Sequence, residues 1–167
     1  MKILFKFRLY FLALWLLTIP VFLYAQTDPL ENRSAAEEIE TLLNTKAVTY
    51  AQASRFVLEA ANVLAVNDPE EAFNYAVMQG WLPGKAAADD PARLDFISLL
   101  IMRSFDIKGG IMYSIVKTQT AFAAHYAYRE LTYKNVIQKR SDPAMLVSGE
   151  RLLFFVNRQL GRMEAGN

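Results

Sequence analysis

Hydrophobic positions after residue 33 recur mostly with the period of an α-helix. In 49–66, Ala53, Val57 and Leu64 belong to one apolar face. The stretch 94–102 is apolar almost throughout, which is typical of a helix buried on every side. The pattern therefore predicts an all-α protein with 94–102 in its core.

The segment 68–105 contains the signals of a complete helix-loop-helix unit. Asp68 is a helix cap, Pro69 suits the first turn, and Glu71 is placed to reach back to the cap. Gly80 ends this helix because it adopts the left-handed conformation at no steric cost. After a polar loop, Asp90 and Pro91 open the second helix.

Two weaker units flank this one. The first has a helix over 34–44, capped by Ser34, and a second helix that begins at Thr49, with Gln52 completing a capping box. The last has helices over 121–133 and 148–160. The first helix of each unit is closed by a residue that tolerates positive φ: Asn44, Gly80 and Asn135. The second helix of each unit begins at one of three residues: Thr49, Ala92 and Ser148.

Units of this length cannot bury an apolar helix alone. We therefore expect one compact bundle of three helix-loop-helix units over 34–162, preceded by a tether at 26–33 and followed by a short tail at 163–167. The segment 106–120 breaks the helical pattern at Gly109 and Gly110, and its alternating apolar residues fit either a short strand or an ordered loop.

The first 25 residues have the pattern of a secretory signal helix. Lys2, Lys6 and Arg8 precede an apolar run over 9–24, and Ala25 is a small residue at a plausible cleavage site. The alternative is an uncleaved N-terminal anchor, although the run is shorter than the roughly 20 residues that span a bilayer. We expect an exported protein, periplasmic or at the cell surface.

Composition excludes several functional classes. Without residues 1–25 the chain carries 15 Lys and Arg against 17 Asp and Glu, because the removed segment holds three basic residues and no acidic one. This balance argues against nucleic-acid binding, which favours strongly basic domains. The absence of cysteine excludes disulfides and a lipid-modified N-terminal cysteine.

Catalytic motifs are absent as well. The sequence has one histidine, His125, no glycine-rich phosphate loop, no nucleophile elbow and no zinc spacing. We expect no catalytic residue, no metal site and no cofactor.

The central unit resembles an S-layer homology repeat. The resemblance is carried by Gly80-Trp81-Leu82-Pro83-Gly84, the polar loop, and the run 92–96, which is similar to the Thr-Arg-Ala-Glu-Phe type motif that opens the second helix of such repeats. The segments 132–156 and 49–58 resemble the same pattern more distantly. Over 34–162 the resemblance implies three repeats around a pseudo-threefold axis, with grooves that hold cell-wall glycan.

Carried over residue by residue, the family's motif arginine falls on Arg93 and its acidic partner on Asp95. Trp81 and Gly80 match the loop that closes the groove. The sequence departs from the family at the other two units, where the arginine and acidic positions hold Tyr50, Gly149, Gln52 and Arg151.

Each candidate residue also has a purely structural interpretation. Arg93 and Asp95 lie two apart, so on a helix they would not face each other. Arg93 either grips an anionic glycan or carboxylate, or is a first-turn charge paired with Asp89 or Asp90. Trp81 either stacks on a sugar or packs against the helix that Gly80 ends.

Two larger groups remain. Five aromatic residues form either a partner surface or part of the core: Tyr113, Phe122, Tyr126, Tyr128 and Tyr133. Six basic residues form either a patch for an anionic surface or a solvated face paired with Glu130 and Glu150: Lys134, Lys139, Arg140, Arg151, Arg158 and Arg162.

These observations lead to two functional hypotheses. In the first, the protein is a non-catalytic cell-envelope protein that attaches to cell-wall glycan or peptidoglycan through Trp81, Gly80, Arg93 and Asp95. In the second, it is a protein-protein adaptor in an envelope assembly and has lost glycan binding. A membrane contact is expected only through an uncleaved leader.

Overall fold

The structure, a computed structural model, describes residues 29–116, 118–139 and 141–165. The expected signal segment, residues 1–25, lies outside these residues. Contacts divide the chain into two units, Met1–Glu40 and Thr41–Asn167. In the described part of the chain, no helix has both the length and the apolar character needed to cross a membrane.

Helix α2 (Pro29–Leu43) runs across the boundary between the two units. It begins earlier than expected, because Pro29 suits the first turn of a helix. The expected tether is therefore helical from Pro29, and Ser34 lies inside the helix rather than at its cap. Asn44 is not among the described residues with positive φ, so the expectation of a left-handed stop there was wrong.

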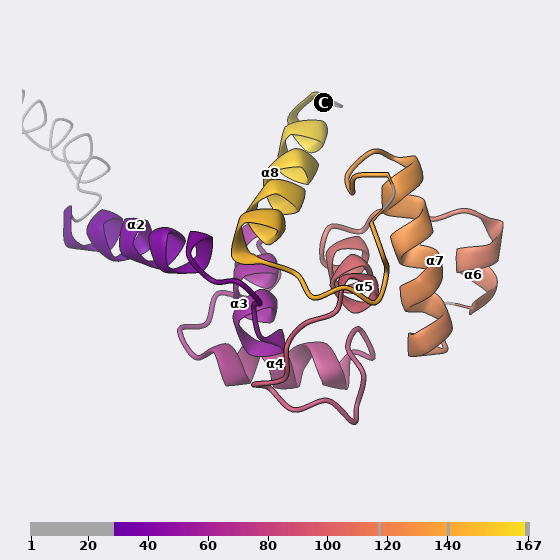
Figure 1. Ribbon diagram of the computed structural model, residues 1–167, viewed down its shortest axis with the longest axis horizontal. Helices are drawn as coiled ribbons and strands as arrows, with labels where there is room; N and C mark the ends of the chain where they lie inside the picture. The colour runs from indigo at the N-terminus through magenta and orange to yellow at the C-terminus, as the bar shows by residue number, and fades with distance from the viewer. Residues whose placement is uncertain (1–28, 117, 140, 166–167) are drawn as a thin grey trace, which may run out of the picture. The chain divides into compact units, whose positions relative to one another are not determined.

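All the secondary-structure elements of the second unit are helices in the part that the structure describes, which confirms the all-α prediction. Its helices are α3 (Tyr50–Ala60), α4 (Pro69–Met78), α5 (Leu94–Ser104), α6 (Ile111–Val116), α7 (Thr120–Tyr133) and α8 (Gly149–Ala165) (Figure 1). Within the segment 106–120, residues 111–116 form the short helix α6, which was not expected, and residues 106–110 are not helical.

Two predicted helix starts are confirmed. The Thr49 hydroxyl accepts from the Gln52 backbone N–H at 3.2 Å, and the Gln52 side chain accepts from the Thr49 N–H at 3.1 Å, which completes the capping box. Asp68 caps α4 by accepting from the Glu70 N–H at 2.9 Å.

Four helices end in a left-handed residue: Asn62, Gly80, Asp106 and Asn135. After each, the next backbone N–H donates to a carbonyl in the last helical turn, as from Trp81 to Ala76 at 2.9 Å and from Val136 to Leu131 at 2.8 Å. This arrangement is the Schellman motif, which satisfies carbonyls that the helix leaves free. The sequence predicted the stops at Gly80 and Asn135.

Helix α5 is the centre of the core, as its apolar sequence predicted. Leu94, Ile97 and the run 99–102 are buried. Helix α5 packs most extensively against α7. Three alanines of α7 are fully buried: Ala123, Ala124 and Ala127. Small side chains on α7 let the two backbones approach closely.

A closed ring of backbone hydrogen bonds joins the segments that precede α3, α5 and α8. The Val48 N–H donates to the Val147 carbonyl at 2.8 Å, Val147 donates to Ala92 at 3.0 Å, and Ala92 donates to Val48 at 2.8 Å. All three residues are buried. Each segment therefore contacts both of the others in the same way.

A second set of bonds, donated two residues further on, joins the same three segments in a cycle that runs in the opposite direction. The N–H groups of Tyr50, Leu94 and Gly149 donate to the carbonyls of Asp90, Met145 and Thr45 at 3.0, 2.9 and 2.9 Å. At Gly149 the backbones come so close that an added Cβ would lie 1.6 Å from the Leu42 carbonyl oxygen. The close approach of this backbone to the end of α2 therefore requires glycine at position 149.

Candidate functional site

Arg93 occupies the cap of α5 rather than its first turn. Its backbone is extended, with φ −87° and ψ 146°, and its side chain makes no capping hydrogen bond. The residue that follows the ring is Thr49 before α3, Arg93 before α5 and Ser148 before α8. The expectation that Ala92 is the equivalent of Thr49 and Ser148 was therefore wrong by one residue, and Leu94 is level with Tyr50 and Gly149.

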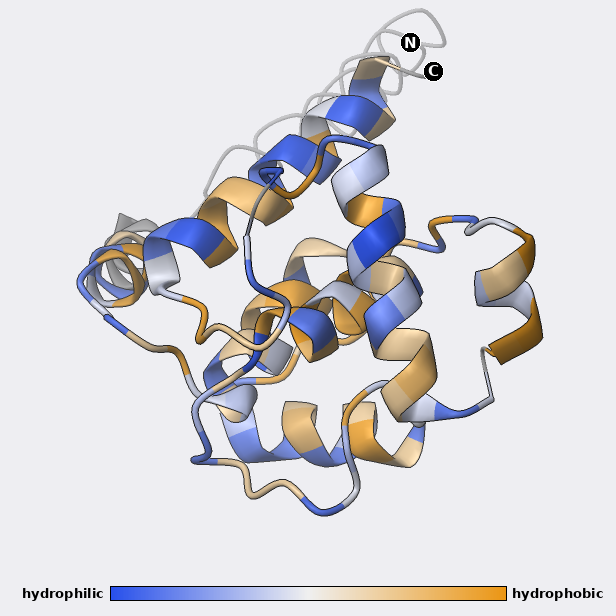
Figure 2. Ribbon diagram, turned by 45° about the vertical axis from the view of Figure 1, so that its right-hand side comes forward, coloured by the Kyte–Doolittle hydropathy of each residue, from blue (hydrophilic) through white to orange (hydrophobic). Residues whose placement is uncertain are grey.

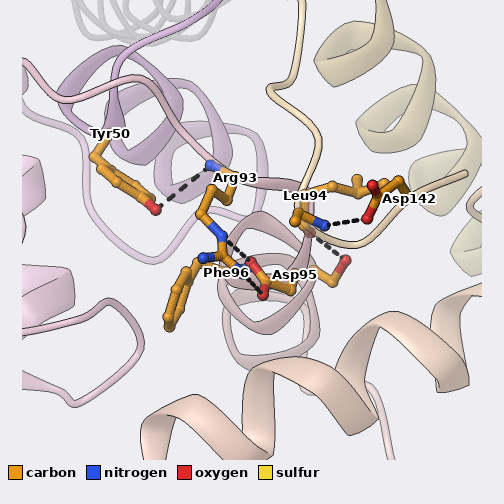
Figure 3. Close-up of polar contacts among 8 residues, drawn as sticks. Tyr50, Arg93, Leu94, Asp95, Phe96 and Asp142 are labelled. Atoms are coloured by element: carbon orange, nitrogen blue, oxygen red, sulfur yellow. Dashed lines mark hydrogen bonds and ion pairs between the residues drawn. The ribbon is translucent and has the colours of Figure 1, made fainter.

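The extended backbone brings Arg93 and Asp95 together. Arg93 Nη2 donates to Asp95 Oδ2 at 2.6 Å, and Arg93 Nε donates to Asp95 Oδ1 at 3.3 Å (Figure 3). The expectation that the two side chains act on different neighbours was wrong, because it assumed that both residues were helical. Pairing of Arg93 with Asp89 or Asp90 is not seen either.

Asp95 is held from several sides, whereas Arg93 remains accessible. The Asp95 carboxylate also accepts from the Phe96 N–H at 2.9 Å, and its own N–H donates to the Pro143 carbonyl at 2.9 Å. The side chains of Arg93 and Asp95 are 46% and 12% exposed. The hydrogen bond to Asp95 raises the pKa of Arg93, so the guanidinium stays charged.

Two aromatic rings border this pair. The Arg93 guanidinium lies over the Phe96 ring at 5.6 Å, and the Phe96 ring meets the Tyr50 ring edge to face at 6.4 Å. The Tyr50 hydroxyl accepts from the Arg93 backbone N–H at 3.4 Å (Figure 3). Burial raises the pKa of Tyr50, which keeps its hydroxyl neutral. We call Tyr50, Arg93, Asp95 and Phe96 the Arg93 cluster.

Gly80 and Trp81 belong to a different set of contacts. Gly80 has φ 69° and its carbonyl accepts from the Thr120 hydroxyl at 3.2 Å. Trp81 is half-buried and its ring meets Tyr75 of α4 edge to face at 5.9 Å. We find no hydrogen bond, ion pair or ring contact between Trp81 and the Arg93 cluster. Trp81 thus packs against α4, the helix that Gly80 ends, as its structural interpretation predicted.

Sequence reasoning missed Tyr50 and Phe96 as parts of this cluster. Tyr50 was noticed only as a departure from the family motif. When the starts of α3 and α5 are aligned at their cap residues, Thr49 and Arg93, Tyr50 and Leu94 take the same position. This alignment is the signal in the sequence that could have placed Tyr50 near Arg93.

The aromatic series divides between core and surface. Tyr113 is buried, Tyr126 and Tyr128 are half-buried, and Phe122 and Tyr133 are exposed. His125 is exposed and its ring contacts Tyr126. Among residues 29–116, 118–139 and 141–165, no group of three acidic or histidine side chains is placed to hold a metal.

The basic residues near the C-terminus do not pair with Glu130 or Glu150 within the described residues. Arg162 donates to the Lys134 carbonyl at 2.7 Å, and Arg158 lies over the Phe154 ring at 5.6 Å. Glu130 instead accepts from the Gly110 N–H at 2.8 Å. The side chain of Arg140 lies outside the described residues.

Comparisons with known proteins return no match: no protein-family model, no curated protein and no solved structure matches this chain.

Proposed function

We propose that this chain is an exported, non-catalytic cell-envelope protein of three S-layer-homology-like units that binds cell-wall glycan at the Arg93 cluster. The observation that carries the proposal is the exposed guanidinium of Arg93, held between the Asp95 carboxylate and the Phe96 ring.

The ring of hydrogen bonds supports the three-unit part of the proposal. The ring is a cycle of backbone hydrogen bonds among Val48, Ala92 and Val147. Each of these residues lies two positions before the first residue of its helix. Such an arrangement fits three related units around a common axis. The Schellman stops at Gly80 and Asn135 end α4 and α7 in the same way.

The chemistry of the Arg93 cluster suits sugar hydroxyls. Asp95 uses only part of the N–H donors of the guanidinium, and the remaining donors belong to a side chain that is 46% exposed. The half-buried Phe96 ring offers an apolar surface beside them. Because Asp95 compensates the charge, the cluster favours neutral hydroxyls of a glycan over a strongly anionic polymer.

The adaptor hypothesis draws on the same geometry. In the adaptor, the Arg93–Asp95 pair is a structural clasp at the start of α5, since its fork is already filled by a carboxylate. A clasp of this kind has no role in binding, so the two functions differ in what loss of Arg93 does to glycan affinity.

The test is sedimentation of the purified full chain with cell-wall sacculi at low salt. We expect recovery of the wild type with the sacculi and a loss of about tenfold in affinity for Arg93→Ala, in line with removal of a charged hydrogen-bond donor. Arg158→Ala is the matched control, because Arg158 also lies over a phenyl ring but makes no ion pair with a described residue.

Two further measurements separate binding from folding. Thermal unfolding of each variant shows whether Arg93→Ala is still folded at the assay temperature. Arg93→Lys keeps the charge and loses the planar fork, so under the proposal it stays folded and binds weakly. No recovery of the wild type with sacculi would overturn glycan binding and favour the adaptor.

A further inference from the structure

The backbone N–H of Arg93 is directed away from the segment that pairs with it. Arg93 and Leu146 face each other in an antiparallel bridge. The bonds of this bridge come from residues on either side, such as the bond from the Leu94 N–H to the Met145 carbonyl at 2.9 Å. In such a pair the facing residues are not bonded to each other, and their own N–H groups are directed to the opposite side. The Arg93 N–H therefore needs an acceptor elsewhere.

The hydroxyl of Tyr50 is that acceptor. Its oxygen lies 3.4 Å from the Arg93 nitrogen (Figure 3), and no other described residue accepts from this N–H. The bond is at the long end of the usual range, so its contribution is that of a modest neutral hydrogen bond. Without it, the Arg93 N–H would have no partner within the described residues, although the bond is partly buried.

Tyr50 is itself held in place and is closed off from solvent. Its side chain is 3% exposed, so a bound glycan would meet Arg93 rather than Tyr50. The Tyr50 N–H donates to the Asp90 carbonyl at 3.0 Å, and its ring meets the Phe96 ring edge to face at 6.4 Å. Figure 2 colours most of α5 as hydrophobic, so the Arg93–Asp95 pair is a polar group at the start of an apolar helix.

We propose that Tyr50 is a positioning residue: its hydroxyl, supplied by α3, holds the Arg93 backbone in the extended conformation that brings the guanidinium to Asp95 and Phe96. Tyr50 thereby affects glycan binding only through Arg93, and this part of the inference rests on the proposed function. The effect of Tyr50 on Arg93 in the free protein does not depend on any ligand.

The first test is made on the free protein. Tyr50→Phe removes the hydroxyl and keeps the ring against Phe96, so the protein should remain folded. Tyr126→Phe is the control, because the Tyr126 hydroxyl makes no hydrogen bond with a described residue. In NMR spectra of the full-length chain we expect the Arg93 backbone N–H and the Arg93 Nε–H to shift in Tyr50→Phe and to stay unchanged in Tyr126→Phe.

The second test is a double-mutant cycle on sedimentation with cell-wall sacculi. Tyr50→Phe should bind the sacculi about threefold more weakly than the wild type, as for loss of one neutral hydrogen bond. In the Arg93→Ala background the same change should have no further effect on affinity, because Tyr50 acts only through the guanidinium. A residue that contacted the glycan itself would instead give additive losses.

An Arg93 Nε–H resonance that is unchanged in Tyr50→Phe would overturn the proposal, whether or not the wild type binds sacculi. Rapid solvent exchange of the Arg93 backbone N–H in the wild type would also overturn it, and this measurement needs no variant. A further loss of about threefold when Tyr50→Phe is added to Arg93→Ala would exclude action through Arg93. If the wild type is not recovered with sacculi, the proposed function fails, and the spectra of the free protein still decide the role of Tyr50.

Discussion

Arg93 acquires its environment from the backbone conformation of one residue. Had it been helical, Asp95 would lie about 200° further round the helix axis, outside the reach of its guanidinium. In the extended conformation the side chain folds back over the first turn of α5 and meets both the carboxylate and the Phe96 ring. A rule of sequence spacing therefore failed because α5 begins at Leu94, after the start at Asp90 and Pro91 that the sequence indicated, and leaves Arg93 outside the helix.

At this scale we predict a stability cost for losing Arg93. Arg93→Ala leaves the mostly buried Asp95 carboxylate without its ion pair, which should lower the free energy of unfolding by about 1–2 kcal/mol. Urea denaturation measures the difference. Arg158→Ala, which loses a ring contact and no ion pair, should change stability by about 0.5 kcal/mol or less. Equal losses in the two variants would contradict a stabilising ion pair between Arg93 and Asp95.

The tyrosine hydroxyls predict how stability depends on alkaline pH. Burial raises the pKa of Tyr50 and of Tyr113 above the ordinary value of 10.0. Their contribution is therefore fully present below about pH 10 and is lost as pH rises through the folded-state pKa, because the unfolded chain ionises first. Unfolding titrations should show a shallower alkaline loss in Tyr50→Phe with Tyr113→Phe than in the wild type. An unchanged slope would contradict burial of these hydroxyls.

At the scale of elements, two glycines of α8 have opposite roles. Gly149 faces the Leu42 carbonyl so closely that no side chain fits, whereas Gly161 has nothing within 4 Å of an added Cβ. The sequence showed Gly149 only as a departure from the family motif, since a close approach between distant backbone segments leaves no local pattern.

Alanine substitution distinguishes the two glycines. Gly149→Ala must displace the backbone at Leu42 and should cost roughly 2–4 kcal/mol or prevent folding. Gly161→Ala, in an open helical position, should stabilise the protein by about 0.5–1 kcal/mol. Denaturation midpoints compare the two, and similar effects would contradict the close approach at Gly149.

Helix ends were predictable where the residue type strongly favours one role at a helix end. The sequence predicted the capping box of Thr49 and Gln52 because these side chains bond to free backbone N–H groups. It predicted the stop at Gly80 because glycine adopts positive φ without a steric cost. Asn62 and Asp106 also adopt the left-handed conformation, but both residue types are common in ordinary loops. Helix α6 was not predicted, because its apolar residues lie on the exposed side and its anchor, Tyr113, is a single residue.

At the scale of the molecule, the second unit is organised by the ring through Val48, Ala92 and Val147. The apolar stretch 94–102 predicted the core. The ring itself was beyond prediction from sequence, because its bonds join backbone groups and require no particular side chain.

The ring predicts the pattern of amide hydrogen exchange. Because each bond closes a contact between segments far apart in the chain, the amides of Val48, Ala92 and Val147 should exchange only through global unfolding and share one opening free energy. Exchange monitored by NMR under native conditions measures these values. Much faster exchange at one of the three amides would mean that the ring opens locally, contrary to a single closed unit.

The central claim is that glycan binds at the Arg93 cluster, and its most direct test is an NMR titration of the full chain with soluble peptidoglycan fragments. We predict chemical-shift changes at the Arg93 Nε–H and at the Tyr50 and Phe96 rings that saturate together, with little change at the Arg158 Nε–H. The absence of shifts at the Arg93 cluster under saturating fragment, or shifts confined to other surfaces, would contradict it.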